Sequence, residues 1–288
     1  MFGRLLILLL AVLPKHLMSR MAGALANLAV PGRLRPSVYR AYSRIFGAAP
    51  EEAELALSEY PSLNAFFTRG LKPGLRPVAD GAIVSPADAT VGASGPVADD
   101  TLLQAKGRNY SLAALLGDDT LAHRMDGGSF ATLYLAPRDY HRIHVPVDGV
   151  ITGAAYIPGA LWPVNLFAVA HVADLFAVNE RIVITIEQPG GGGVVSVVLV
   201  GATMVGMTRL VFDDLHTNAR RRETQRRTYT PPVPVRAGAP LGHFEFGSTV
   251  IVVCSPDSGA VDPLAAGQTV RMGQRLGQIA SPSGAGAT

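Results

Sequence analysis

Residues 181–200 read RIVITIEQPGGGGVVSVVLV, two apolar runs of β-branched residues that flank a glycine-rich turn. β-Branched side chains favour extended backbone, and runs of this length bounded by Gly and Pro are typical of strands. The stretch therefore predicts a β-hairpin with Pro189–Gly193 at its tip. A phosphate-binding loop would need Gly-Lys-Ser or a helix after the glycines, and the sequence continues into a second apolar run.

Similar runs occur on both sides of this hairpin, separated by turn residues. They are Phe130–Leu135, Gly149–Ile157 and Thr249–Val253. The 31 glycines and 21 prolines of the 288-residue chain also favour many turns and short strands. Residues 81–288 are thus predicted to form a β-rich domain.

A weak internal repeat supports this interpretation. Residues 235–244 (VRAGAPLGHF) resemble residues 270–279 (VRMGQRLGQI), and each reads as a turn leading into a strand. This form is common in small barrels with sandwich character, such as lipoyl and biotinyl domains. Those carrier domains modify a lysine, and no lysine follows Lys106. A carrier module is therefore excluded.

The N-terminal part has a different pattern. Between residues 37 and 67 the apolar residues recur at helical spacing, for example Tyr39, Tyr42 and Phe46, and acidic residues 51, 52 and 54 open a second helical segment. The predicted fold class is α+β, mostly β. Residues 1–80 are predicted to form a helical, membrane-associating region, and residues 81–288 a β-rich, barrel- or sandwich-like domain.

The first thirty residues allow three interpretations. The unbroken apolar run Leu5–Leu13 is shorter than the ~20 residues that a spanning helix needs. A secretory signal would use residues 24–26 as its cleavage box, but Lys15, His16 and Arg20 lie between the apolar run and that box. A plain buried helix is the second interpretation. A monotopic anchor with basic flanks fits the pattern best.

Composition excludes several functional classes. With 48% hydrophobic residues the chain can bury a core, and its single cysteine, Cys254, excludes an intrachain disulfide framework. No Cys/His spacing matches a zinc site, so no metal is predicted. The three lysines, at 15, 72 and 106, leave few candidates for a Schiff base to pyridoxal phosphate. The net charge is only +3, and the sequence has no stripe of basic and aromatic residues of the kind that binds nucleic acid. Nucleic acid is therefore not predicted as a partner.

Three short segments carry residues suited to catalysis. Gly247-Ser248-Thr249 directly precedes an apolar strand, Ser85-Pro-Ala-Asp88 places an acid in a turn, and Tyr140-His-Arg-Ile-His144 places two imidazoles three residues apart. Gly-Ser-Thr alone is a common turn, and a lone histidine is usually structural. The three together supply a nucleophile, a base and an acid.

At these residues the chain resembles the phosphatidylserine decarboxylase family in its bacterial membrane-bound form. The resemblance extends from about Leu63 to Ile279 and comprises several motifs in the same order. They are NAFFTR at 64–69, SPAD at 85–88, YHRIH at 140–144, LFAVNER at 175–181, Gly201-Ala202 with Val205-Gly206, and FEFGST at 244–249.

The resemblance implies a proenzyme that cuts itself between Gly247 and Ser248. Ser248 Oγ attacks the preceding carbonyl, which Gly247 leaves open to approach. By the same analogy His144 is the base and Asp88 orients it. β-Elimination of the resulting ester turns Ser248 into a pyruvoyl group. The products would be chains of residues 1–247 and 248–288, which form a heterodimer. Further assembly into a homo-oligomer stays open.

The implied reaction is the decarboxylation of phosphatidylserine to phosphatidylethanolamine and carbon dioxide, through a Schiff base to the pyruvoyl group. His141 would lie near the substrate carboxylate or donate the proton. The implied location is the cytoplasmic face of the inner membrane, peripheral or monotopic, against an anionic membrane surface. Basic residues 220–227 are a candidate membrane-facing region, although a solvated loop is the simpler interpretation. The segment around Trp162 is a candidate lipid-access loop, although a core aromatic is the simpler interpretation.

Two residues depart from the family pattern, and three other functions stay open. Ala89 stands where the family has Gly after the acid, which would shift that turn, and Phe246 stands where many members have Leu. The alternatives are a Ser-His-Asp hydrolase using Ser248, His144 and Asp88, a non-enzymatic lipid- or protein-binding barrel, and a related pyruvoyl enzyme for another phospholipid such as archaetidylserine.

Overall fold

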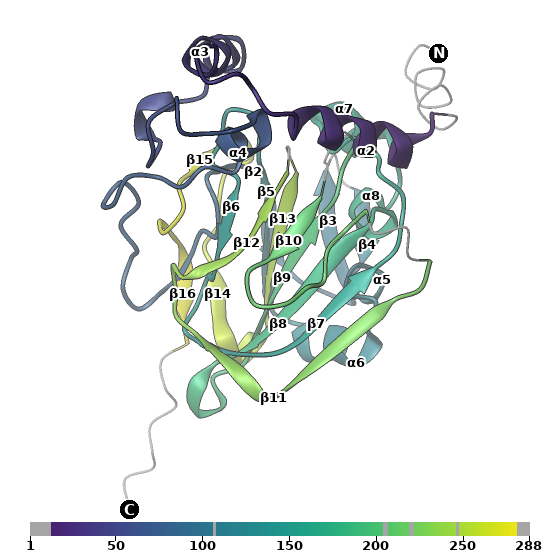
Figure 1. The fold of residues 1–288 in the computed structure, drawn as a ribbon. Coiled ribbons are helices and arrows are strands. Elements are labelled where there is room, and N and C mark those ends of the chain that lie inside the picture. The colour runs from purple at the N-terminus through teal and green to yellow at the C-terminus, as the bar shows by residue number, and fades with distance from the viewer. Residues whose placement is uncertain (1–12, 106–107, 204–206, 219–221, 246–247, 281–288) are drawn as a thin grey trace, which may run out of the picture.

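A computed structural model describes residues 13–105, 108–203, 207–218, 222–245 and 248–280. Its centre is an eight-stranded antiparallel sheet with the order β11-β7-β8-β9-β13-β5-β2-β15 (Figure 1). The strands are β2 (Ala89–Pro96), β5 (Ser129–Tyr134), β7 (Gly149–Ile157), β8 (Arg181–Glu187), β9 (Val194–Val200), β11 (Gln225–Val235), β13 (Thr249–Cys254) and β15 (Thr269–Val270).

The predicted hairpin is confirmed as β8 and β9, in register from Arg181↔Val200 to Glu187↔Val194. A single turn of 3-10 helix, Pro189–Gly191, forms its tip. Every residue of β9 is buried because this central strand is covered on both faces, which explains its apolar sequence with Ser196 as the one polar residue.

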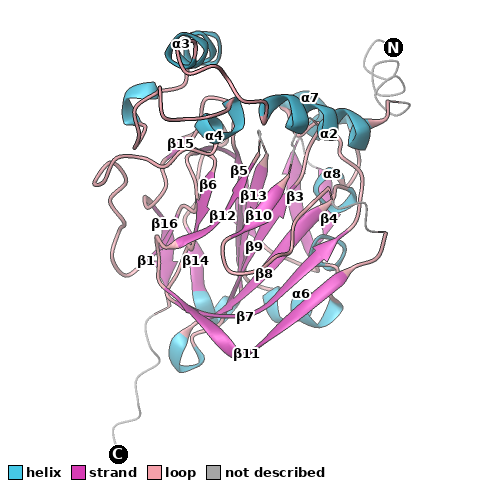
Figure 2. Cartoon of the chain, in the orientation of Figure 1, coloured by secondary structure: helices cyan, strands magenta, loops and turns pink. Residues whose placement is uncertain are grey.

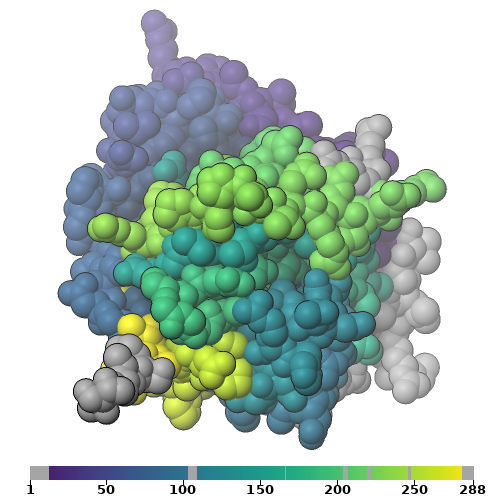
Figure 3. Space-filling model, turned by 90° about the horizontal axis from the view of Figure 1, so that it is seen from below, coloured from purple at the N-terminus to yellow at the C-terminus, as the bar shows by residue number. Residues whose placement is uncertain are grey.

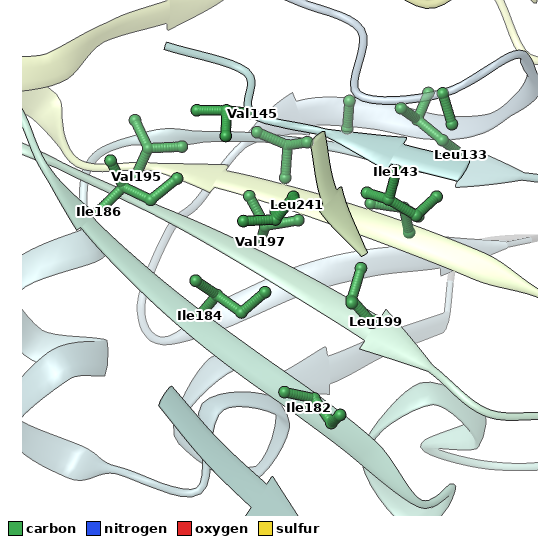
Figure 4. Close-up of a cluster of buried hydrophobic side chains, with 14 of the residues drawn as sticks. Leu133, Ile143, Val145, Ile182, Ile184, Ile186, Val195, Val197, Leu199 and Leu241 are labelled. Carbon is green, nitrogen blue, oxygen red and sulfur yellow. The ribbon is translucent and has the colours of Figure 1, made fainter. Parts of the chain in front are cut away.

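One face of the sheet packs against two three-stranded sheets. These are β10-β12-β6 (Thr208–Leu210, Pro240–Phe244, Arg142–His144) and β1-β16-β14 (Ala82–Val84, Arg275–Ile279, Gly259–Val261). Figure 4 shows side chains of one buried cluster, which joins the two layers. Its members include Ile143 and Leu241 of the sheet β10-β12-β6, Ile182, Ile184 and Ile186 of β8, and Val195, Val197 and Leu199 of β9. This shared core makes the molecule a sandwich.

The other face packs against the hairpin β3–β4 (Thr101–Ala105, Arg108–Ser111) and four short helices. They are α5 (Leu112–Leu116), α6 (Asp119–Met125), α7 (Leu166–His171) and α8 (Leu175–Val178). Side-chain caps stabilise three of them: Ser111, Asp118 and Asn165 each accept a hydrogen bond from a backbone N–H in the first turn. The sequence pattern did not indicate these helices.

The N-terminal helices are α2 (Lys15–Ala26), α3 (Arg35–Phe46) and α4 (Leu63–Phe67), and they lie together at one end of the sheet (Figures 1 and 2). Figure 3 views the opposite end, where β11 crosses the surface. Stacked aromatic rings of Tyr39 and Phe66, 4.9 Å apart, centre a separate small core. The segment after α3 was predicted to be helical, but only Pro50–Glu52 forms a 3-10 turn, and extended chain and turns follow until α4.

The α+β, mostly β prediction is confirmed, and of the two architectures considered the described residues form a sandwich, with no closed barrel among them. Both repeat segments run from a turn into a strand, β12 and β16, as predicted. No helix in the described part of the chain is long and apolar enough to cross a membrane. The apolar run 5–13 lies outside the described residues except for its last residue.

Candidate active site

Ser248 lies one residue beyond a row of strand ends. The ladder pairs Thr249 with Tyr134 of β5 on one side and with Val200 of β9 on the other, and Val200 pairs with Arg181 of β8. Ser248 is fully buried, its backbone carbonyl accepts a hydrogen bond of 2.9 Å from Leu135 N, and its hydroxyl donates to the carbonyl of Val200. Gly247, the other side of the predicted cleavage point, lies outside the described residues.

His141 faces the segment that leads to Ser248. Its carbonyl accepts a hydrogen bond from Phe244 N at 3.0 Å, four residues before the serine, and its ring lies 4.0 Å from that of Phe67 in α4. The Nδ1 atom is 2.8 Å from the carbonyl of Asp139, and a carbonyl only accepts, so Nδ1 carries the proton. Nε2 is then an unprotonated acceptor, buried and without a hydrogen-bond partner among the described residues.

Burial controls the charge of this imidazole. Desolvation lowers the pKa of His141 to about 3, against a weaker opposing effect of the Asp139 carbonyl. His141 is therefore neutral at physiological pH. A buried nitrogen with an unused lone pair is a costly feature, and such atoms concentrate at functional sites.

His144 follows three residues later and has both nitrogens occupied. Nδ1 donates to the carbonyl of Gly238 at 2.8 Å, which leaves Nε2 to accept from the hydroxyl of Tyr140 at 3.1 Å. Its backbone N–H donates to Pro86 O at 2.8 Å, so the turn that carries Asp88 lies against this strand. Burial lowers the pKa of His144, and the charge of Asp88 acts in the opposite direction.

Asp88 has a different direct partner from the one that the triad analogy implies. Its oxygens accept from Arg76 at 2.5–3.0 Å and from the backbone N–H of Met272 at 2.9 Å. Arg76 also binds Glu52 at 2.7 Å, and its pKa is raised, chiefly by Asp88. The negative charge of Asp88 thus acts on His144 electrostatically. The hydrogen bonds that orient His144 come from Tyr140 and Gly238.

The two departures from the family pattern have different outcomes. Ala89 begins β2 as a buried residue and is absent from the positive-φ residues of the described chain, so the expected shift of this turn has no basis in backbone strain. Phe246 lies outside the described residues.

The sequence reasoning missed several residues that shape this site. Arg76 was not singled out as a site residue, and Tyr140, Asn179 and Glu180 appeared only within the matching motifs. Burial would have distinguished them, since Asn179 and Glu180 are almost completely inaccessible to solvent. Polar residue types such as Asn and Glu are mostly exposed, so the sequence gave no sign of that burial.

The described residues suit a group made from Ser248 itself. No three or more of their His, Cys, Asp and Glu side chains converge as a metal ion would require. Ser248 is buried directly before β13. His141, whose Nε2 has no hydrogen-bond partner among the described residues, directly precedes β6, which pairs with β12 in the segment before Ser248. A carbonyl group at position 248 would therefore be buried, with the imidazole of His141 on a segment that pairs with the residues before it.

Comparison with known proteins gives a consistent result. A family model described as phosphatidylserine decarboxylase matches residues 63–278. Proteins named phosphatidylserine decarboxylase proenzyme are similar over nearly their whole length. The one from Anaeromyxobacter sp. (strain K) is 46% identical over 97% of this chain and 100% of its own, and the one from Myxococcus xanthus is 43% identical over 94% and 97%. A third, from Pseudomonas fluorescens, is 40% identical over 95% and 97%.

Proposed function

The chain belongs to the phosphatidylserine decarboxylase family, and we propose that it decarboxylates phosphatidylserine after cutting itself at Gly247-Ser248. The observation that carries the proposal is the burial of Ser248 directly before β13, where its hydroxyl donates to the carbonyl of Val200. His144 ends β6 and His141 directly precedes it, and β6 pairs with β12, the strand that leads toward Ser248. The name proenzyme of the relatives supports processing into two chains, residues 1–247 and 248–288.

Self-cleavage begins with the hydroxyl of Ser248. Its oxygen bonds to the carbonyl carbon of residue 247, the peptide C–N bond breaks, and an ester links the two parts of the chain. Loss of the α-proton of Ser248 then expels residues 1–247 with a free carboxylate. Water converts the remaining dehydroalanine to a pyruvoyl end with release of ammonia.

In this scheme His144 is the base for the serine proton. Accepting a proton at Nε2 would require the Tyr140 hydroxyl to turn away, because that hydroxyl occupies the lone pair. The negative charge of Asp88 favours the imidazolium that results, which makes its contribution electrostatic rather than a direct hydrogen bond. Arg76 holds Asp88 in place through their ion pair.

Decarboxylation uses the product of this cleavage. A pyruvoyl group supplies an electron-withdrawing carbonyl that takes up the electron pair left when the carboxylate departs as carbon dioxide. His141 is proposed to hold and transfer a proton at Nε2, the buried acceptor with no other partner among the described residues. Its surroundings exclude water, since the residue is fully buried against Phe67.

The experiment that tests this proposal pairs intact mass with product analysis. Purified protein is expected to give two chains, the smaller with a blocked N-terminus, and to convert phosphatidylserine in mixed vesicles to phosphatidylethanolamine and carbon dioxide. Vesicles with archaetidylserine test the related substrate, and a fluorophosphonate probe tests the hydrolase alternative. An uncut chain that labels with the probe and releases no carbon dioxide would refute the proposal.

We also propose that α2 associates with the cytoplasmic face of the inner membrane. One side of the helix packs on the molecule through Ser19, Gly23 and Ala26. The other side exposes Leu17, Met21 and Leu25, with exposed fractions of 48%, 56% and 67%. His16 Nε2 lies 3.1 Å from the carbonyl of Gly159, so this apolar stripe is fixed near the end of the sheet that holds Ser248.

Replacing Leu17, Met21 and Leu25 together by glutamine is expected to lower the affinity for anionic vesicles at least tenfold. Burying each apolar side chain in lipid contributes on the order of 1–2 kcal/mol, so three partly buried residues exceed the ~1.4 kcal/mol of a tenfold change. Vesicle sedimentation measures the effect. Val211→Gln, which changes a residue of similar 58% exposure outside the helices, is the control. Equal binding of all three proteins would contradict the placement of the membrane contact.

A further inference from the structure

The peptide unit that joins Val200 to Gly201 is held at both ends. Its carbonyl accepts the hydrogen bond from the hydroxyl of Ser248, and its N–H donates to the carbonyl of Glu180 at 2.8 Å. Hydrogen bonds in series polarise one another, so the bond to Glu180 strengthens the hydrogen bond between the Val200 carbonyl and the Ser248 hydroxyl. The orientation of this single peptide therefore sets the direction of the Ser248 hydroxyl.

Asn179 holds the adjoining peptide unit, Gly201–Ala202, and so fixes Gly201 from its other side. Its side chain is fully buried, and its Nδ2 donates to the carbonyl of Gly201 and to that of Trp162, both at 2.9 Å. Its Oδ1 accepts from the backbone N–H of Trp162 at 2.9 Å. The amide thus joins the loop around Trp162 to the strand end that holds Ser248.

The fit around Gly201 leaves this peptide little freedom. A Cβ atom at Gly201 would lie 3.0 Å from the carbonyl oxygen of Glu180 and 3.1 Å from Leu161 Cδ2. Both distances are tighter than ordinary van der Waals contact, and one of the two neighbours is backbone. A larger residue would therefore require Gly201 or these two neighbours to shift, and Gly201 carries the N–H of the peptide whose carbonyl faces Ser248.

We propose that Asn179 is a positioning residue for self-cleavage, acting through the Val200–Gly201 peptide that directs the hydroxyl of Ser248. The inference rests on the proposed self-cleavage and deepens it. Cleavage consumes this hydroxyl, because the oxygen leaves with residues 1–247. The hydrogen bonds of the Asn179 side chain are consequently needed before cleavage and not for the decarboxylation that follows.

Asn179→Asp tests the proposal because it keeps the size of the side chain and removes both N–H donors that hold the carbonyls. In a cell-free synthesis time course, followed by mass, we expect the uncut chain to disappear at least tenfold more slowly than in the wild type. The decarboxylation rate, divided by the amount of blocked small chain, should stay within twofold. Hydroxylamine, which cleaves esters, should trap no extra intermediate, because the defect precedes attack.

Ser255→Ala is the matched control at the other end of the same two strands. The Ser255 hydroxyl accepts a hydrogen bond of 2.9 Å from Val194 N, so the variant also removes a buried side-chain contact between β13 and β9. It should cleave like the wild type. If both variants slow cleavage equally, the effect is loss of general stability and the proposal is wrong.

Other outcomes also decide the matter. Wild-type cleavage by Asn179→Asp, an accumulated ester, or a parallel fall in decarboxylation per small chain would each overturn the positioning role. If Asn179→Asp is insoluble, Gly201→Ala tests the same peptide, and its cleavage at the wild-type rate would overturn the proposal. A wild-type chain that never cleaves would instead refute the proposed function.

Discussion

Ser248→Ala is expected to leave a single uncut chain with the full mass of 288 residues and no detectable decarboxylase activity. The substitution removes only the oxygen that forms the ester, and no other group can provide the carbonyl that the reaction needs. The fold should persist. Ser248 is fully buried, and its backbone carbonyl still accepts from Leu135 N, so the strand end keeps its pairing. Intact mass and carbon dioxide release measure the two effects.

Ser196→Ala provides the control for this variant. Ser196 is a fully buried serine of the neighbouring strand β9, and its hydroxyl has no hydrogen-bond partner among the described residues. Loss of that hydroxyl should leave two chains and full activity. Thermal unfolding of the three proteins should show that all are folded. A Ser248→Ala protein that still appears as two chains would place the cleavage elsewhere and contradict the assignment of this serine.

The strands of the central sheet could be predicted because each is a short apolar run between turn residues. For β8 and β9 the limits in the sequence and in the structure agree to within a residue. The helices α5 to α8 could not, because each has seven residues or fewer and covers a β-sheet face with a few apolar side chains. A segment this short shows barely one helical period, so the sequence contains too little pattern to detect.

The site divides in the same way. Ser248, His141, His144 and Asp88 are identifiable as chemical types in a familiar order, but their partners depend on three-dimensional packing. Nothing in the sequence indicates that Asp88 binds Arg76, twelve residues earlier, or that Tyr140 occupies His144. Likewise, Asn179 could not be connected with Ser248 before the register of β8, β9 and β13 placed both beside Val200 and Gly201. Long-range register is the information that local patterns lack.

Changing His141 and His144 to asparagine, one at a time, should affect different reactions: the first decarboxylation, the second self-cleavage. Asparagine reproduces a donor at the position of Nδ1, so it can keep the bond to Asp139 O in one case and to Gly238 O in the other. In both variants it removes Nε2. We expect His141→Asn to cleave normally and to lose decarboxylation by about 10²–10⁴-fold, the usual contribution of a general acid or base. His144→Asn should instead remain mostly uncut.

The same measurements, mass for cleavage and carbon dioxide for decarboxylation, also reveal a reversed assignment. Among the described residues, Nε2 of His141 has no hydrogen-bond partner, whereas Nε2 of His144 is occupied by Tyr140. If His141→Asn stays uncut while His144→Asn cleaves, the open nitrogen serves as the cleavage base and the proposed roles are exchanged. A pH profile adds an independent check. Since burial lowers the pKa of His141 to about 3, its neutral form persists as the pH falls below the ordinary histidine value. Decarboxylation by processed enzyme should therefore show no loss near pH 6.5 from protonation of this residue.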